Sequence, residues 1–333
     1  MCGSGGKICW RPLLHDVLPP VTSLPPTKSP PPRPSPSGGE GEEIRILFPS
    51  VKRDEPLARH TSWGIGGPAD YYLEIRTRDE LKKIVDWTLA HGVPLTPLGQ
   101  GSNLLVSDKG IRGVTVRLRG DFEALRFEGD RAVAGGGVLL PQISRAAAER
   151  SLTGAEPFCG IPGTVGGALR TNAGTPEGDI GRLVREVEVM DAAGKIRRLN
   201  RDDIRFAYRH SSVSGQIVLS VDLQLRAGNK NDILAAIDRM LKRRAERQPL
   251  GTKNCGSVFK NPPGDHAARL IDAAGLKGFR VGGAQVSPKH ANFIENVDHA
   301  TAADVHTLID ALRSAVRQRF GIELELEVWT VGE

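Results

Sequence analysis

The sequence is poor in cysteine, with only Cys2, Cys9, Cys159 and Cys255 in a chain of 333 residues. No two of them form a C-x-x-C pair, which argues against the common zinc spacings and against a disulfide framework. The sequence also has no run of about 18 apolar residues and no long apolar segment near the N-terminus, so neither a membrane span nor a secretory signal is expected. We therefore expect reduced thiols in a cytoplasmic protein.

Neither sign of charge dominates the sequence. The chain carries 45 lysine and arginine residues against 39 aspartate and glutamate residues, a net charge of +6. The basic residues are scattered, whereas nucleic-acid binding usually calls for a concentrated basic stripe. We therefore expect an anionic small molecule as the partner, with no nucleic acid. No histidine–carboxylate cluster has ligand spacing, so no metal is expected.

Proline is concentrated at the N-terminus. Ten of the 23 prolines lie in the first 36 residues, which include the run SPPPRPSPSGGEGEE. Proline removes backbone donors and blocks helix formation, and little in this stretch could be buried. We interpret residues 1–45 as a disordered tail; binding through its P-x-x-P segments is the alternative.

Periodic apolar patterns begin after the tail and predict a mixture of helices and strands. The predicted helices cover 79–92, 138–152, 231–249, 266–274 and 302–319. The predicted strands cover 70–75, 95–99, 103–106, 114–118 and 217–226, with a hairpin at 184–199. The first strands and the helix between them have the spacing of a βαβ unit. A domain boundary is expected near residue 228.

Glycine is abundant, at 39 residues, with clusters at 64–67, 99–103, 135–137 and 160–167. Each cluster alone is best read as a tight turn, but several together favour a large anionic cofactor, because free amides in such loops can cradle phosphate. The G-x-G-x-x-G fingerprint and the P-loop are both missing. A bound dinucleotide would therefore occupy a fold other than the Rossmann fold.

Seven blocks of sequence occur in an order typical of one enzyme family. They are RHTSWGIGGPADYYLE, PLGQGSNLLVSDKGIRGV, GIPGTVGGALRTNAG, YRHSSV, GSVFKNP, AGLKGFRVGGAQVSPKHANFIEN and LELEV. Together they resemble the UDP-N-acetylenolpyruvoylglucosamine reductases, over about residues 50–332. The spacing is similar to that of the shorter (type II) subtype, which lacks an extra segment over the substrate.

The resemblance implies an α+β fold in which two subdomains form an FAD-binding unit of the vanillyl-alcohol-oxidase type, followed by an α+β substrate-binding domain. We place the first subdomain at 46–120, the second at 121–227 and the UDP-sugar domain at 228–333. The family implies FAD as cofactor and NADPH as electron donor. The glycine loop GQGSN at 99–103 lacks histidine and cysteine, which favours non-covalent FAD. A monomer is expected.

The resemblance also implies a reaction in peptidoglycan precursor synthesis, and hence a part in cell-wall biogenesis, cell shape and cell division. NADPH reduces FAD, and the enolpyruvyl ether of UDP-N-acetylglucosamine then takes the place of NADP⁺. Hydride passes from flavin N5 to the vinyl carbon C3, and a proton reaches C2, which gives UDP-N-acetylmuramate. Negative charge at C2 can spread into the substrate carboxylate, so the site must stabilise two oxygens and supply one proton.

Three residues match the catalytic positions of the family. Arg209 matches an arginine whose forked guanidinium suits a carboxylate, although the pattern alone would allow a surface arginine. Glu327 matches a glutamate that can donate a hydrogen bond if burial keeps it protonated, although it could belong to a solvated strand edge. Ser257 matches the proton donor, because a carbanion-like carbon is a strong base that a nearby hydroxyl can protonate; a turn serine is the alternative.

The remaining site residues also come from the resemblance. FAD contacts are expected from Gly99, Gly101, Ser102, Asn103, Gly163, Thr164, Gly166, Gly167 and Asn172. Substrate contacts are expected from Asn261, Lys277 and Lys289. In a straight strand Ser257 and Lys260 would face opposite sides, so either the backbone bends there or Lys260 has a structural or peripheral role. Asn261 is preferred because it matches a substrate contact of the family more closely.

The sequence departs from the family at two places. NAGTPEGDIG replaces the usual aromatic-glycine end of the asparagine loop. Trp329 stands where many members have arginine, and Arg170 is a candidate to compensate for that lost cation. Two other functions stay open: a flavin oxidase of the same fold, and a flavin-loaded protein without enzymatic activity. A flavin oxidase would not need Ser257, Asn261 and Glu327 together, and the combination of Arg209, Ser257 and Glu327 argues against a protein without enzymatic activity.

Overall fold

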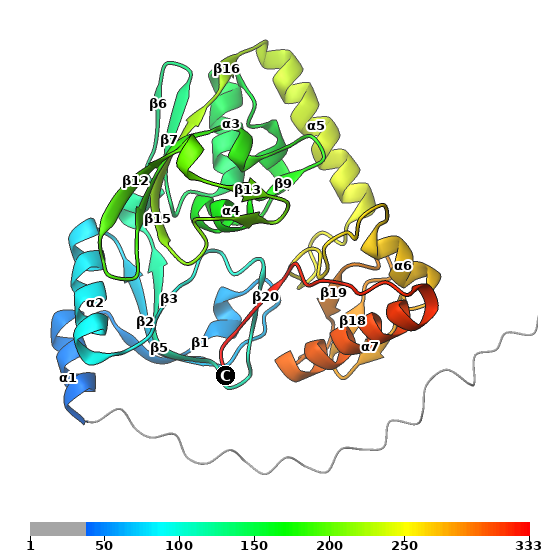
Figure 1. Cartoon of the computed structure of the whole chain (residues 1–333), viewed down its shortest axis with the longest axis horizontal. Coiled ribbons are helices and arrows are strands. Elements are labelled where there is room, and N and C mark those ends of the chain that lie inside the picture. Colours follow the sequence, from blue (N-terminus) through cyan, green and yellow to red (C-terminus); the bar gives the residue numbers. More distant parts are fainter. Residues whose placement is uncertain (1–37) are drawn as a thin grey trace, which may run out of the picture. The chain divides into compact units, whose positions relative to one another are not determined.

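The computed structural model describes residues 38–333 (Figure 1). Most of the predicted tail, residues 1–37, lies outside the described residues. The last part of that prediction is wrong, because α1 (Gly38–Leu47) is helical and its Ile44 side chain is fully buried. Ile44 and Phe48 are four residues apart, a spacing that places both on one helix face against the core.

The first sheet follows the predicted βαβ pattern. Its strand order is β1 (Lys52–Pro56), β2 (Pro68–Ile75), β5 (Ile111–Leu118) and β3 (Leu95–Pro97). Strands β2, β5 and β3 are parallel, and β1 is antiparallel to β2. The helix α2 (Arg78–His91) begins with a capping box between Thr77 and Glu80 and ends at Gly92, whose φ is 63°.

The second sheet is antiparallel throughout. Its strand order is β12 (Ile196–Asn200), β11 (Val184–Met190), β15 (Ile217–Gln224), β7 (Arg131–Gly135) and β6 (Leu125–Glu128). β11 and β12 form the predicted hairpin. The helices α3 (Leu140–Glu149) and α4 (Val165–Thr171) share an apolar core with this sheet. Met190, Ile217 and Leu219 join the core of the first sheet, so the two sheets are packed together.

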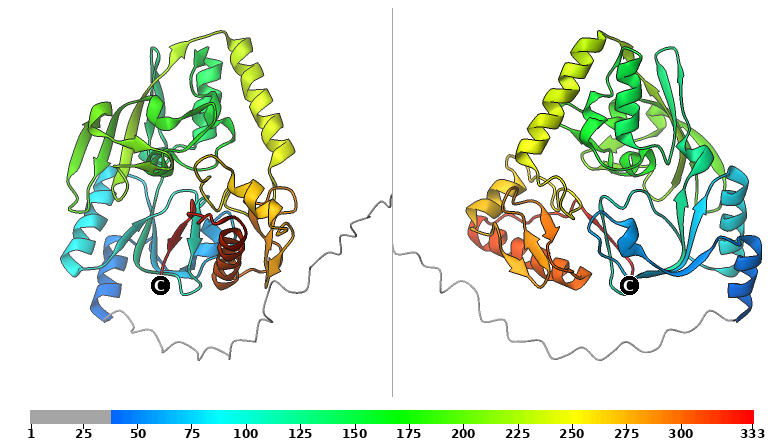
Figure 2. Two further views of the ribbon diagram at one scale, coloured as in Figure 1. Left: turned by 45° about the vertical axis from the view of Figure 1, so that its right-hand side comes forward. Right: turned by 180° about the vertical axis from the view of Figure 1, so that it is seen from behind.

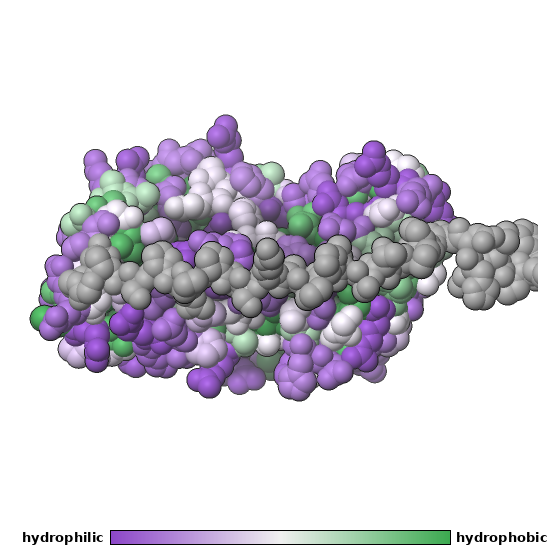
Figure 3. Space-filling model, turned by 90° about the horizontal axis from the view of Figure 1, so that it is seen from below, coloured by the Kyte–Doolittle hydropathy of each residue, from purple (hydrophilic) through white to green (hydrophobic). Residues whose placement is uncertain are grey.

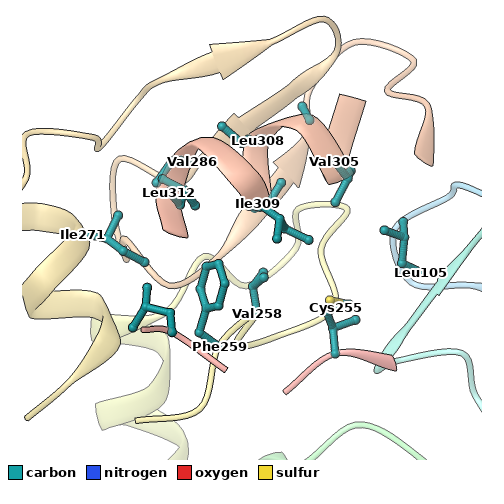
Figure 4. Close-up of a cluster of buried hydrophobic side chains, with 14 of the residues drawn as sticks. Leu105, Cys255, Val258, Phe259, Ile271, Val286, Val305, Leu308, Ile309 and Leu312 are labelled. Carbon is teal, nitrogen blue, oxygen red and sulfur yellow. The ribbon is translucent and has the colours of Figure 1, made fainter. Parts of the chain in front are cut away.

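The helix α5 (Lys230–Arg247) runs from the second sheet to the C-terminal elements in Figures 1 and 2. Its N-terminal cap is Asn229, two residues before the predicted start of this helix, and the Asn229 side chain accepts hydrogen bonds from the amides of Asn231 and Asp232. The C-terminal elements are α6 (Ala267–Ala273), β17 (Arg280–Val281), β18 (Ala284–Val286), β19 (Ile294–Asn296) and α7 (Ala302–Phe320). Figure 4 shows Val258 and Phe259 within their core, beside α7.

The last strand returns to the first part of the chain. β20 (Trp329–Val331) pairs in parallel with β4 (Leu104–Val106), the strand that directly follows the glycine loop at 99–103. This pairing departs from a strictly linear substrate domain at 228–333, and the predicted domain boundaries otherwise stay predictions. Short strand pairs are β8 (Leu152–Thr153) with β16 (Arg226–Ala227), β9 (Gly174–Thr175) with β10 (Gly178–Asp179), and β13 (Phe206–Ala207) with β14 (His210–Ser211). Single-turn 3-10 helices cover Leu57–His60, Gly120–Glu123, Glu156–Gly160, Ile180–Arg182 and Arg201–Asp203.

The face in Figure 3 is largely hydrophilic, with scattered hydrophobic residues. Among the described residues, no helix combines the length and the hydropathy that a membrane crossing needs. Within the same residues, no group of three or more histidine, cysteine, aspartate or glutamate side chains is arranged to hold a metal ion.

Candidate active site

A cavity of about 840 Å³ is lined by the glycine loops at 99–103 and 160–167 and by the helix α4. Residues 255–257, Glu327 and Trp329 also line it. Eight of the nine predicted cofactor residues line it: Gly99, Gly101, Ser102, Asn103, Gly163, Thr164, Gly166 and Gly167. The structure thus brings together two loops that lie some sixty residues apart in sequence. The hydroxyl of Ser102 donates to the carbonyl of Pro162 at 3.1 Å, which joins one loop to the other.

Side chains larger than glycine would not fit where these loops meet. A Cβ atom on Gly99 would lie 2.8 Å from the Thr164 hydroxyl oxygen. Gly101 has a φ of 66°, and a Cβ there would lie 2.1 Å from the carbonyl oxygen of His60. Both the positive φ and the close approach therefore require glycine at position 101.

The loops also present backbone donors to the cavity. Within residues 38–333, the amides at positions 99–102 donate no hydrogen bond, and neither do those of Gly163 and Thr164. Consecutive free amides form a concave donor set for phosphate oxygens. The loops therefore fit the diphosphate of a dinucleotide such as FAD, and the cavity has the volume of a large ligand site.

The three predicted catalytic residues all line this cavity. The chain at 258–260 runs antiparallel to 325–327: the Glu327 amide donates to the Val258 carbonyl, and the Lys260 amide donates to the Glu325 carbonyl, both at 2.8 Å. Buried Val258 and Phe259 anchor this segment in the C-terminal core, which fixes the backbone that carries Ser257. Among the described residues, the Ser257 hydroxyl has no hydrogen-bond partner.

Arg209 and Glu327 form an ion pair, with Nε of the arginine 2.5 Å from Oε1 of the glutamate. Their side chains are 23% and 15% exposed. Burial raises the pKa of the Glu327 carboxyl above its usual value, and the Arg209 guanidinium opposes that rise. Arg209 also donates to the carbonyl of Gly174 at 3.1 Å, and its backbone has a φ of 55°. The guanidinium is thus held at the cavity by two partners.

Lys260 and Glu325 are not among the residues that line this cavity, whereas Ser257 is. Lys260 Nζ lies 3.2 Å from Glu325 Oε2.

Four predicted site residues do not line the cavity. Asn172 is the C-terminal cap of α4. Its side-chain Nδ2 donates to the carbonyl of Ala207, and its side-chain Oδ1 accepts from the backbone amide of Gly181. Asn261 accepts a bond from the amide of Ala267 at the start of α6. Both asparagines therefore have structural partners in this conformation.

The two predicted lysines lie elsewhere on the C-terminal part of the chain. Lys277 forms an ion pair with Asp272 at 2.8 Å, and Lys289 donates to the Ala245 carbonyl at 2.6 Å. Long lysine side chains reorient easily, so these contacts describe where the cations rest and leave their substrate roles as predictions.

Besides Arg209, four arginines line the cavity, and none of them was among the predicted site residues: Arg117, Arg119, Arg170 and Arg244. Arg244, from α5, lies over Gly160, where an added Cβ would meet its Cδ at 2.9 Å. Arg170, from α4, stacks on the ring of Trp329 with its Cζ 4.2 Å from the ring centroid. Arg170 had been noted only as a substitute for a missing cation, and nothing in the pattern RRAERQP distinguished Arg244 from its neighbours.

Comparison with known proteins places these features in a family. Residues 69–200 match a family model described as an FAD binding domain, and residues 248–331 match one described as the C-terminal domain of UDP-N-acetylenolpyruvoylglucosamine reductase. The reductase 2 of Symbiobacterium thermophilum is 49% identical over 280 residues, which cover 84% of this chain and 91% of that protein. The reductase of Moorella thermoacetica is 49% identical over 294 residues, which cover 88% and 97%.

The chain belongs to the UDP-N-acetylenolpyruvoylglucosamine reductase family. A crystal structure of the reductase from Thermus caldophilus matches with a TM-score of 0.75 at 39% identity, covering 85% of this chain and 99% of that one. The predicted family and the predicted α+β, FAD-binding fold class are therefore confirmed. As a member of this reductase family with an FAD-binding domain, the protein is a flavin-dependent oxidoreductase.

Proposed function

We propose that this protein catalyses the NADPH-dependent, FAD-mediated reduction of UDP-N-acetylglucosamine enolpyruvate to UDP-N-acetylmuramate, a step of peptidoglycan precursor synthesis. The observation that carries the proposal is the meeting of Arg209, Glu327 and Ser257 in one cavity with the amide-rich loops. The names of the relatives support the substrate. The proposal includes a monomeric enzyme that acts in the cytoplasm and serves cell-wall growth.

The residues of both loops would hold FAD through their free amides, and bound FAD supplies the hydride. Arg209 would bind the substrate carboxylate, because a guanidinium matches two carboxylate oxygens. It already holds a carboxylate, that of Glu327, at 2.5 Å. The substrate would therefore take over a guanidinium that is positioned for an anion of this geometry.

Glu327 would act in its protonated form. A charged carboxylate would repel the negative charge that develops on the substrate oxygens, whereas a protonated one donates a hydrogen bond to them. Burial raises the pKa of Glu327, which favours this form. Loss of Arg209 to the substrate would favour it further, because the charge that opposes the rise would then be shared.

Ser257 would donate the proton to C2. The hydroxyl is weakly acidic, but the acceptor is a strongly basic carbon, and proximity then decides the rate. Its neighbours Val258 and Phe259 are buried, so the hydroxyl is carried by a well-anchored backbone. Asn261, Lys277 and Lys289 stay proposed substrate contacts at the edge of this region.

Steady-state oxidation of NADPH by the purified yellow holoenzyme tests the proposal. We expect oxidation only when the enolpyruvyl nucleotide is present, with one UDP-N-acetylmuramate formed for each NADPH consumed, as measured by mass spectrometry. Equal oxidation driven by oxygen alone would favour a flavin oxidase of the same fold. Absence of turnover with every nucleotide tried would favour a flavin-loaded protein without this activity.

A further inference from the structure

Arg170 is one of four arginines that line the cavity together with Arg209, and it has no assigned role. Arg170 lines the cavity and stacks on Trp329, with Cζ 4.2 Å from the ring centroid. The stacked ring covers one face of the guanidinium and fixes its plane, because cations are held over the electron-rich face of indole. The side chain is half-buried, so its position is determined by packing.

The charge of Arg170 is not neutralised by an acidic neighbour. Among residues 38–333, no carboxylate lies within ion-pair distance of its guanidinium, and its buried Nε has no hydrogen-bond partner. Burial lowers the pKa of Arg170, and no neighbouring charge contributes to that change. The Nε of Arg209 also makes no hydrogen bond to a described residue, but Arg209 has the Glu327 carboxylate within ion-pair distance. A half-buried guanidinium without an anion is costly unless a ligand supplies one.

The position of Arg170 places it beside the reacting region. Its stacking partner, Trp329, follows Glu327 by two residues, and both side chains line the cavity. The two guanidiniums therefore border the region where Glu327 lies, one in contact with that carboxylate and one over the adjacent ring.

The charge that develops on the substrate indicates which anion Arg170 binds. Hydride addition to an alkene that carries a carboxylate places two negative charges on the resulting enediolate. Arg209 and a charged Glu327 cancel each other, and Arg209 with a protonated Glu327 supplies only one positive charge. A second cation is needed beside the reacting carboxylate, and Arg170 is the cavity arginine that stacks on Trp329, two residues from Glu327.

We propose that Arg170, held by Trp329, is a second binding residue for the substrate carboxylate and discriminates in favour of nucleotide sugars that carry this acid. The inference rests on the proposed function and adds a specificity-determining residue to it. The carboxylate would be bound by two guanidiniums, Arg209 and Arg170. The diphosphate would be bound elsewhere.

Two nucleotides that differ in the acid test this inference. UDP-N-acetylmuramate carries the carboxylate, and UDP-N-acetylglucosamine lacks it, while both carry the same diphosphate. Each is titrated into oxidised holoenzyme, with the flavin absorbance and calorimetry as readouts. We expect Arg170→Gln to weaken binding of UDP-N-acetylmuramate by about 10- to 100-fold and to leave binding of UDP-N-acetylglucosamine unchanged.

Matched variants separate this effect from general loss of charge or folding. Arg145→Gln removes an exposed arginine from α3 outside the cavity and should leave both affinities unchanged. Trp329→Leu should give a smaller loss with the same selectivity for the acid. Arg170→Lys, which keeps the charge without the planar fork, is titrated if Arg170→Gln does not retain FAD, and should show a partial, acid-selective loss.

Three results would overturn the inference while leaving the reductase activity intact. Equal weakening of both nucleotides would assign Arg170 to the diphosphate. Unchanged affinities would assign it a packing role with Trp329. A shifted flavin reduction potential without acid-selective weakening would assign its charge to the flavin ring. Wild-type holoenzyme that binds neither nucleotide would overturn the proposed function itself and this inference with it.

Discussion

The ion pair between Arg209 and Glu327 is the feature at the residue scale on which the chemistry depends. Both residues line the cavity, and in the proposed reaction each takes up a further role when the substrate carboxylate binds. Burial and the arginine act on Glu327 in opposite directions, with burial the larger cause. The balance leaves the pKa raised, so the protonated, donating form persists to higher pH than it would in an exposed glutamate.

This balance predicts a pH dependence. Because the protonated form of Glu327 is the donor, the substrate half-reaction of the wild type should be fast below its raised pKa and fall above it, by about tenfold per pH unit. Glu327→Gln keeps a donor at every pH, so its rate should lose this limb of the profile. Rapid-mixing measurements of flavin reoxidation from pH 5 to pH 9 check the difference. The same falling limb in both proteins would exclude Glu327 as its source.

The groups that face Glu327 would otherwise confuse the profile. They are Arg209 and Lys260, whose charges lower its pKa, and the buried Cys255, whose own pKa is raised well above the usual value by burial and then by Glu327. Cys255→Ser in both backgrounds controls for the thiol.

At the scale of elements, the site depends on the contact between the glycine loops at 99–103 and 160–167. Their local geometry is demanding at Gly101, where positive φ and the nearby His60 carbonyl both exclude a side chain. Gly92, at the end of α2, has a similar φ of 63° but open space around its missing side chain. An alanine substitution at each of the two positions therefore separates the cost of a positive φ from the cost of a steric clash.

Gly101→Ala should therefore lose FAD, whereas Gly92→Ala should retain it. Both variants incur the strain of a positive φ, about 1 kcal/mol, but only at Gly101 would the new Cβ lie 2.1 Å from a carbonyl oxygen. We expect FAD affinity to fall at least about 100-fold in Gly101→Ala and to stay within about twofold in Gly92→Ala, since 1.4 kcal/mol corresponds to tenfold. Equilibrium dialysis with FAD measures both. Equal affinities would show that the loop moves without cost.

Elements with strong local signals could be predicted from the sequence. The capped helix α2, the hairpin of β11 and β12, and the helix α7 all lie where apolar period and capping residues placed them. The pairing of β20 with β4 could not be predicted, because short strands far apart in sequence carry no local signal of their partner. The start of α1 was missed because GGEGEE has weak helix propensity, and tertiary burial of Ile44 outweighs it.

In the candidate site, too, some contacts could be predicted from the sequence and others could not. The meeting of Ser257, Arg209 and Glu327 could be anticipated because the family blocks contain all three. Arg170 and Trp329 could not be paired from sequence, because their contact joins α4 to the last strand. Asn172 lies outside the cavity lining, as the left-handed C-terminal cap of α4, and its FAD contact stays a prediction.

At the scale of the whole molecule, function should be confined to the part of the chain after residue 41. Every described residue that lines the cavity lies between Pro97 and Trp329, and residues 42–333 form one compact unit. A variant that lacks residues 1–37 should keep the activity and the unfolding free energy of the full chain. Removal of residues 1–45 should cost about 2–5 kcal/mol of unfolding free energy, because it also removes the buried Ile44.

Urea unfolding of the two truncated proteins and of Ile44→Ala in the full chain checks this prediction. Ile44→Ala should reproduce most of the loss seen in the longer truncation. A large loss of stability or FAD in the shorter truncation would show that residues 1–37 contribute to the fold.

The central claim, that the Ser257 hydroxyl supplies the proton, is tested most directly in the isolated half-reactions. Holoenzyme is reduced with NADPH without oxygen and then mixed rapidly with the enolpyruvyl nucleotide, for the wild type, Ser257→Ala and the exposed-site control Ser314→Ala. The account predicts that all three are reduced by NADPH at one rate, and that only Ser257→Ala is reoxidised about 10²- to 10⁴-fold more slowly. Reoxidation of Ser257→Ala at the wild-type rate would contradict it.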